Sequence, residues 1–100
     1  MMKLIDFNSF MDFCNKLVGK ELHTLYQAKP FVLKSAENER LDWVVKSTNK
    51  PRYSKKTWIQ KYLIRYAKTG SLRPKDYKED KLTESSYILP LIKLYVSGRM

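Results

Sequence analysis

The chain has 100 residues, one cysteine and one histidine, and its 20 Lys and Arg against 10 Asp and Glu leave a net charge of +10. This length predicts a single domain, 1–100, and 43% hydrophobic residues are enough to bury a core, which excludes a disordered chain. The cysteine and histidine counts exclude an internal disulfide and a structural zinc site, and no apolar run approaches the ~20 residues of a membrane span.

The first predicted element is a helix. Apolar residues follow the three-and-four spacing of one helix face across 10–25, and Asp6 or Asn8 is its candidate N-cap. Gly19 lies inside this pattern and costs about 1 kcal/mol relative to alanine in a helix. We therefore expect either one kinked helix or two short helices that meet near Val18.

A β-hairpin is predicted next. Residues 31–35 and 41–47 are rich in β-branched and aromatic side chains and show a two-residue period, and a polar connection of ordinary hairpin length joins them. Leu41, Trp43 and Val45 share one face of the second strand. Because an isolated two-stranded ribbon is marginal in water, this face should pack on the helices.

A second helix is predicted after a polar loop over 48–53. Ser54 is its expected N-cap, the helix should run from Lys55 to about Lys68, and Gly70 stands where a helix C-cap is expected. A projection at 100° per residue separates an apolar face from a basic one, with Ile64 as an exposed exception. The apolar face holds Trp58, Ile59, Leu63, Tyr62 and Tyr66, and the basic face holds Lys61, Arg65 and Lys68.

The C-terminal part is predicted as a loop with a short turn over 71–83, followed by an apolar element over 87–96. Thr83 or Ser86 could cap a helix there, but Pro90 removes an early hydrogen bond. We favour a helix that is irregular at its start and keep an edge strand as the alternative. The order helix, hairpin, basic helix and apolar helix predicts a small α+β domain.

The charge is concentrated in one third of the chain. The segments 1–42 and 76–100 each balance their acids and bases, whereas 43–75 has ten bases and no acid. A charge used only for solubility has no reason to be segregated in this way, while a surface that meets a polyanion does. We therefore expect 43–75 to form a basic surface that contacts phosphates.

The residues predicted to contact nucleic acid come from this segment. Lys55 and Lys56 would reinforce phosphate binding at the free amides of the helix N-terminus. Arg52 and Arg65 are the candidates for base edges, because a guanidinium can bond guanine with two donors, and Tyr53 is the candidate for stacking. The full set is Lys46, Lys50, Arg52, Tyr53, Lys55, Lys56, Lys61, Arg65, Lys68, Arg73 and Lys75.

Signatures of catalysis, metal binding or cofactor binding are absent from the sequence. His23 is expected at a surface and Cys14 in the core, and neither has a partner that would make it catalytic. The acids Asp76, Glu79, Asp80 and Glu84 are clustered and could hold a divalent ion, but a solvated loop explains them more simply. We therefore expect no catalytic residue, no metal and no cofactor.

The function predicted from these features is a non-enzymatic nucleic-acid-binding domain of prokaryotic or phage type, which uses a basic helix and the preceding loop and prefers DNA to RNA. The first alternative is a protein-interaction module or small inhibitor that docks on an acidic partner. The second is a small basic toxin-like ribonuclease that relies on lysine and arginine for electrostatic stabilisation. With no signal peptide or membrane partner expected, the predicted location is the cytoplasm.

Overall fold

The computed structural model describes residues 4–80 and 84–98, and within them it has an α+β architecture of three α-helices and a four-stranded antiparallel sheet. In chain order the elements are α1 (Phe7–Asn15), β1 (Glu21–His23), β2 (Pro30–Ser35), β3 (Arg40–Val45), β4 (Lys50–Lys55), α2 (Lys56–Thr69), the 3-10 helix η1 (Pro74–Asp80) and α3 (Ser85–Ser97). The predicted fold class is confirmed.

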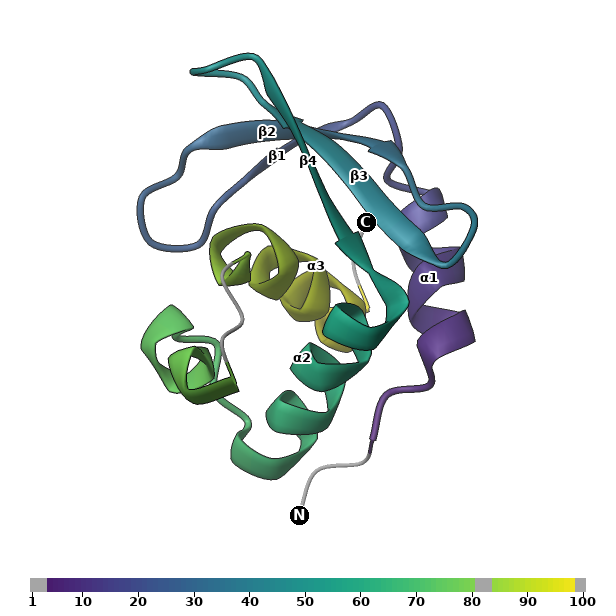
Figure 1. Cartoon of the computed structure of the whole chain (residues 1–100), viewed down its shortest axis with the longest axis vertical. Helices are drawn as coiled ribbons and strands as arrows, with labels where there is room; N and C mark the ends of the chain where they lie inside the picture. Colours follow the sequence, from purple (N-terminus) through teal and green to yellow (C-terminus); the bar gives the residue numbers. More distant parts are fainter. Residues whose placement is uncertain (1–3, 81–83, 99–100) are drawn as a thin grey trace.

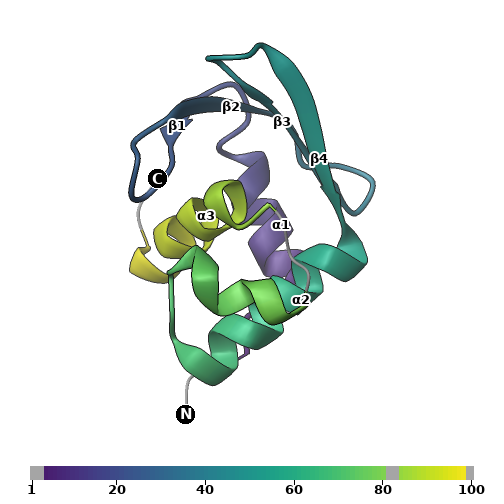
Figure 2. The same cartoon turned by 60° about the vertical axis from the view of Figure 1, so that its left-hand side comes forward.

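The sheet is a meander in which each strand pairs with the next in the sequence, in the order β1-β2-β3-β4. The helices cover one face of this sheet, with α3 lying under it, and the other face is open (Figures 1 and 2). The α3 helix contacts both α1 and α2. The edge strands of the described sheet are therefore β1, which has three residues, and β4, which leads directly into α2.

The predicted hairpin is confirmed, because β2 and β3 pair in antiparallel register. Leu41, Trp43 and Val45 point into the core with exposed fractions of 0, 1 and 4%. Their neighbours Asp42 and Val44 are only half-buried on the open face. The strand therefore shows the two-residue period that the sequence predicts.

The N-terminal prediction is correct for α1 and wrong beyond it. The carboxylate of Asp6 caps α1 by accepting the N–H of Ser9 at 2.9 Å. After Asn15 the chain turns, with Gly19 at φ +88° and its N–H bonded to the Leu33 carbonyl at 2.8 Å. The helical spacing that continues to Leu22 therefore belongs to a strand, β1, because glycine permits a left-handed turn that redirects the chain into the sheet.

The prediction of a loop over 48–53 is wrong from Lys50 onward, because Lys50–Lys55 forms β4. Pro51 lowers the expectation of a strand, but it is tolerated here because β4 lies at an edge. Ser54 is fully buried within this strand, so it is not the predicted N-cap of the next helix. Lys55 occupies the cap position without a side-chain capping bond.

The α2 helix agrees with the prediction at its C-terminus and along most of its apolar face. Gly70 adopts φ +66° and donates its N–H to the Tyr66 carbonyl at 2.7 Å, as a helix C-cap should. Ile64 is the predicted exposed exception at 46%. Trp58, however, is only partly buried, because it lies at the border between the core and the surface.

The C-terminal element is a helix, α3, and not an edge strand. Its apolar residues Ile88, Leu89, Leu91 and Ile92 are almost completely buried in the core, which outweighs the hydrogen bond that Pro90 removes. Of the two predicted caps, Ser86 lies inside the helix and Thr83 lies outside the described residues.

Cys14 is fully buried on α1, as predicted, and burial raises the pKa of its thiol far above the ordinary value. We expect the native chain not to react with a thiol reagent at pH 8, since the thiolate is the reactive form. Absorbance from a chromogenic disulfide reagent would check this, with one equivalent released only after guanidinium is added. Rapid release from the native chain would contradict the burial of Cys14.

Candidate nucleic-acid interface

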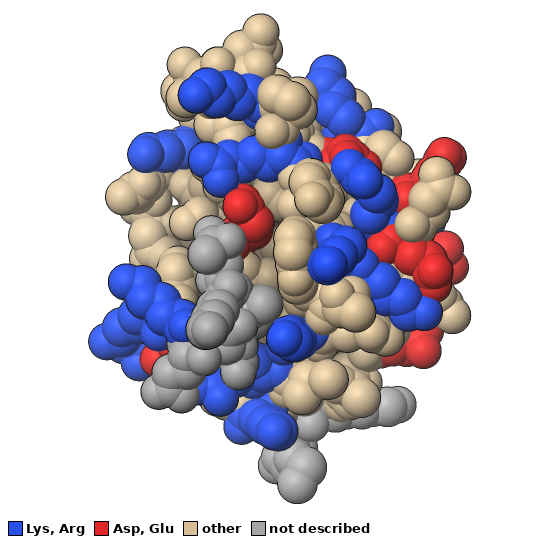
Figure 3. Space-filling view, in the orientation of Figure 1, with Lys and Arg blue, Asp and Glu red and all other residues tan. Residues whose placement is uncertain are grey.

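The basic segment 43–75 covers the second half of β3, the whole of β4 and α2, and the start of η1. Lys and Arg side chains spread over the face of the molecule that presents β4, α2 and η1 (Figure 3). Acidic side chains gather mainly at the right-hand edge of this view. Many Lys and Arg side chains therefore share this face, although acids interrupt it.

Although the segment contains no acid, the fold brings acids to it from other parts of the chain. Each of four predicted contact residues forms an ion pair with a side chain from outside 43–75. The pairs are Lys46 with Glu21 at 2.9 Å, Arg52 with Glu84 at 3.2 Å, Lys56 with Glu39 at 2.7 Å and Arg73 with Asp76 at 3.6 Å. These four cations are thus partly neutralised before any ligand arrives.

Lys55 and Lys56 stand at the N-terminus of α2, where positive charge is unfavourable next to the helix dipole. The Lys55 ammonium lies 4.7 Å from the centre of the Trp58 ring, and the Lys56 ammonium lies 5.2 Å from the Phe7 ring. Lys56 also pairs with Glu39. Contacts within the protein therefore offset the cost of these two lysines, so their position does not require a phosphate.

The two arginines predicted to read base edges are both engaged within the protein. Arg52 donates to both carboxylate oxygens of Glu84, at 3.2 and 3.3 Å, and lies over the Tyr87 ring. Arg65 is half-buried and donates from Nε to the carbonyl of Asp76 at 3.1 Å. Both guanidiniums help to hold α3 and η1 in place against their neighbours.

The remaining predicted lysines form no ion pair with any other described residue. Two of them, Lys61 and Lys68, are exposed seven residues apart on α2, almost two full helix turns, with the exposed Ile64 between them. We call Lys61, Ile64 and Lys68 the α2 stripe. The five predicted lysines without an ion pair to a described residue are Lys50, Lys55, Lys61, Lys68 and Lys75.

Tyr53 belongs to an aromatic cluster at the junction of β4 and α2. Its ring is 47% exposed and stacks on the Trp58 ring with centroids 5.8 Å apart and planes 28° apart. The guanidinium of Arg40 lies 4.4 Å from the Tyr53 ring centre and is held by Asp42. The sequence prediction missed Arg40, because only the pairing of β3 with β4 brings it next to Tyr53.

Two buried tyrosines fix the segments beside α2. The Tyr62 hydroxyl accepts the N–H of Glu84 at 2.9 Å, and the Tyr77 hydroxyl donates to the Ser71 carbonyl at 2.7 Å. Burial raises the pKa of each tyrosine to about 12, so both remain neutral hydrogen-bonding groups at physiological pH. They tie the start of α3 to α2 and anchor η1 to the loop before it.

The remaining candidate residues are His23 and the acids near η1. His23 is exposed on β1 and lies 3.5 Å from the Glu21 carboxylate. Asp76 is not part of a metal site in the described part of the chain, because no three His, Cys, Asp or Glu side chains come together there to hold an ion. The Ser71 hydroxyl, which binds the Asp76 carboxylate, lowers the pKa of that carboxyl group. The side chains of Glu79 and Asp80 lie outside the described residues.

Comparisons of the chain with protein-family models, with curated proteins and with solved structures give no match. Among the described helices, none combines the length and the apolar character that crossing a bilayer requires.

Proposed function

We propose that the chain is a non-enzymatic nucleic-acid-binding domain that contacts phosphates through β4, α2 and η1 and prefers DNA to RNA. The observation that carries the proposal is the α2 stripe, whose two lysines are exposed and form no ion pair with a described residue. Lys55 precedes α2 and Lys75 lies in η1 after it, so lysines without an ion pair to a described residue occur before, on and after α2. The proposal assigns the chain to a prokaryotic or phage type of protein that acts in the cytoplasm.

The preference for DNA is supported by Ile64. An exposed isoleucine between two lysines offers an apolar contact next to the point where the lysines would contact the DNA phosphates. The thymine methyl group in the major groove of DNA is the apolar feature of base edges that RNA lacks. A helix that places lysines on the phosphates and Ile64 in the groove would therefore favour DNA.

The salt dependence of binding tests the proposal. If each of the five lysines without a described ion pair neutralises one phosphate, the logarithm of the association constant should fall with the logarithm of salt with a slope of about −4.5. Fluorescence anisotropy with a labelled 16-base-pair DNA duplex over a series of potassium chloride concentrations would measure it. Duplex RNA of the same sequence should bind more weakly.

Two outcomes would contradict the proposal. One is the absence of binding to duplex DNA at low salt. The other is a slope shallower than about −2, which fewer than three phosphate contacts would give. Saturable one-to-one binding to an acidic protein, with no DNA binding, would favour the interaction module instead. Cleavage of the RNA duplex during the measurement would favour the ribonuclease.

A further inference from the structure

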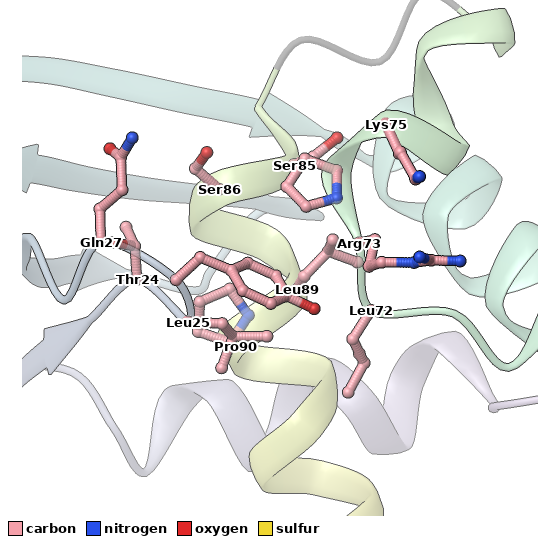
Figure 4. A pocket seen from close by; sticks show the side chains of 12 residues that line it. Thr24, Leu25, Gln27, Leu72, Arg73, Lys75, Ser85, Ser86, Leu89 and Pro90 are labelled. Carbon is pink, nitrogen blue, oxygen red and sulfur yellow. The ribbon is translucent and has the colours of Figure 1, made fainter.

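A cavity of about 440 Å³ opens beside the proposed interface. Its walls come from three segments: the loop 24–27 that joins β1 to β2, residues 72–75 at the start of η1, and the first turns of α3 (Figure 4). A volume of this size lies within the ~300–1,000 Å³ range of small-ligand sites. The cavity is therefore large enough for one nucleotide.

The floor of this cavity is apolar. Leu25, Leu72, Leu89 and Pro90 line it, and Figure 4 shows their side chains below the polar ones. Tyr26 also lines the cavity and is 64% exposed, so the face or edge of an aromatic ring is available at the opening. An apolar floor with an accessible tyrosine suits a flat ring that can stack.

The polar groups of the cavity lie on two sides. The amide of Gln27 and the hydroxyl of Ser86 point in the same direction above the floor, while Arg73 and Lys75 stand on the opposite wall (Figure 4). None of the residues that line it is acidic, although Asp76, next to Lys75 in the chain, pairs with Arg73 at 3.6 Å. An amide and a hydroxyl can bond the polar edge of a base, and the two cations suit a phosphate.

We propose that this cavity binds a single nucleotide, either free or presented by an unpaired end of a strand. The strand-borne form rests on the function proposed above, because Arg73 and Lys75 belong to both sites. The base would stack by Tyr26 over the apolar floor, with its edge toward Gln27 and Ser86. Lys75 and Arg73 would take the phosphate, and the neighbouring α2 stripe would hold the duplex that carries the unpaired end.

Two labelled DNA duplexes test the strand-borne form by fluorescence anisotropy. One has blunt ends, and the other has the same duplex with a three-nucleotide overhang. We expect the overhang to increase the affinity about tenfold, because this is the gain that the stacking of one base on an aromatic ring typically gives. Tyr26→Ala should remove that increase and leave the affinity for the blunt duplex unchanged. Val96→Ala is the control, because Val96 is an exposed side chain on α3 that does not line the cavity. This variant should preserve the increase.

A titration with adenosine 5′-monophosphate, followed by amide chemical shifts, tests the free form. Shifts confined to 24–27, 72–75 and 85–90, lost in Tyr26→Ala, would support the nucleotide site. If these shifts occur without any advantage of the overhang, the ligand is a free nucleotide. If neither the shifts nor an overhang advantage sensitive to Tyr26 is seen, the inference is overturned, even where the blunt duplex binds. If the blunt duplex does not bind while the nucleotide site is supported, the result counts against the proposed function only.

Discussion

We expect the double substitution Lys61→Glu with Lys68→Glu to weaken binding to duplex DNA by roughly 100- to 1,000-fold at about 0.1 M salt. Each substitution removes an attraction of about 1 kcal/mol to a phosphate and adds a repulsion of similar size. Because both side chains are exposed and neither pairs with a described residue, the substitutions break no ion pair within the described part of the chain. The loss should therefore come from the interface and not from the fold.

A matched control separates this effect from net charge. Lys16→Glu with Lys93→Glu changes the charge by the same amount, at the end of α1 and within α3. Like Lys68, Lys16 stands at a helix C-terminus, so each pair carries a similar cost of up to about 1 kcal/mol from the helix dipole. Circular dichroism should show both variants folded, and anisotropy should show weak binding for the first alone. Equal losses in the two variants would mean that the α2 stripe is not the contact surface.

The sequence predicts α2 and the central hairpin because their side chains repeat with a clear period, whereas the apolar stretch of α3 also leaves an edge strand open. Leu41, Trp43 and Val45 stand at every second position, which places all three on the sheet face that packs against the core. The apolar side of α2 repeats every three to four residues in the same way. Such elements can be predicted because the period itself results from packing one face against the core.

The two edge strands could not be predicted from such a period. Only Ser54 of β4 is buried, so the strand has no apolar alternation, and Pro51 argues against a strand. The three residues of β1 continue the helical spacing of α1 by coincidence, with Leu22 in phase. Both strands form because β2 and β3 offer paired neighbours, which is information that lies elsewhere in the chain.

The candidate site likewise combines features that the local sequence predicts with features that depend on distant parts of the chain. The sequence shows that ten cations lie within 43–75, but it does not predict which of them form ion pairs in the folded chain. Glu39 lies 17 residues from Lys56, and Glu84 lies 32 residues from Arg52, and these acids meet their partners only in the folded chain. The cavity beside Tyr26 is likewise built from three separated segments, none of which has a binding motif.

Trp43→Ala should have the largest effect on stability. Trp43 is 1% exposed, lies between Leu33 on β2 and Arg52 on β4, and packs against the Tyr87 ring at 5.5 Å. Loss of the indole leaves a cavity and should cost about 3–5 kcal/mol, a large share of the ~5–15 kcal/mol typical of such a domain. Thermal unfolding should show a Tm lower by roughly 15–30 °C.

Trp43→Phe distinguishes packing from hydrogen bonding as the origin of this loss. The Trp43 Nε1 group is buried without a hydrogen-bond partner among the described residues, so the indole carries a desolvation cost of about 1–3 kcal/mol. Phenylalanine removes that donor and keeps a ring against Tyr87, so this variant should lose no more than about 2 kcal/mol. Equal destabilisation by phenylalanine and alanine would show that Nε1 has a partner in solution. In that case the Trp43 side of the core would be stabilised by a polar contact as well as by packing.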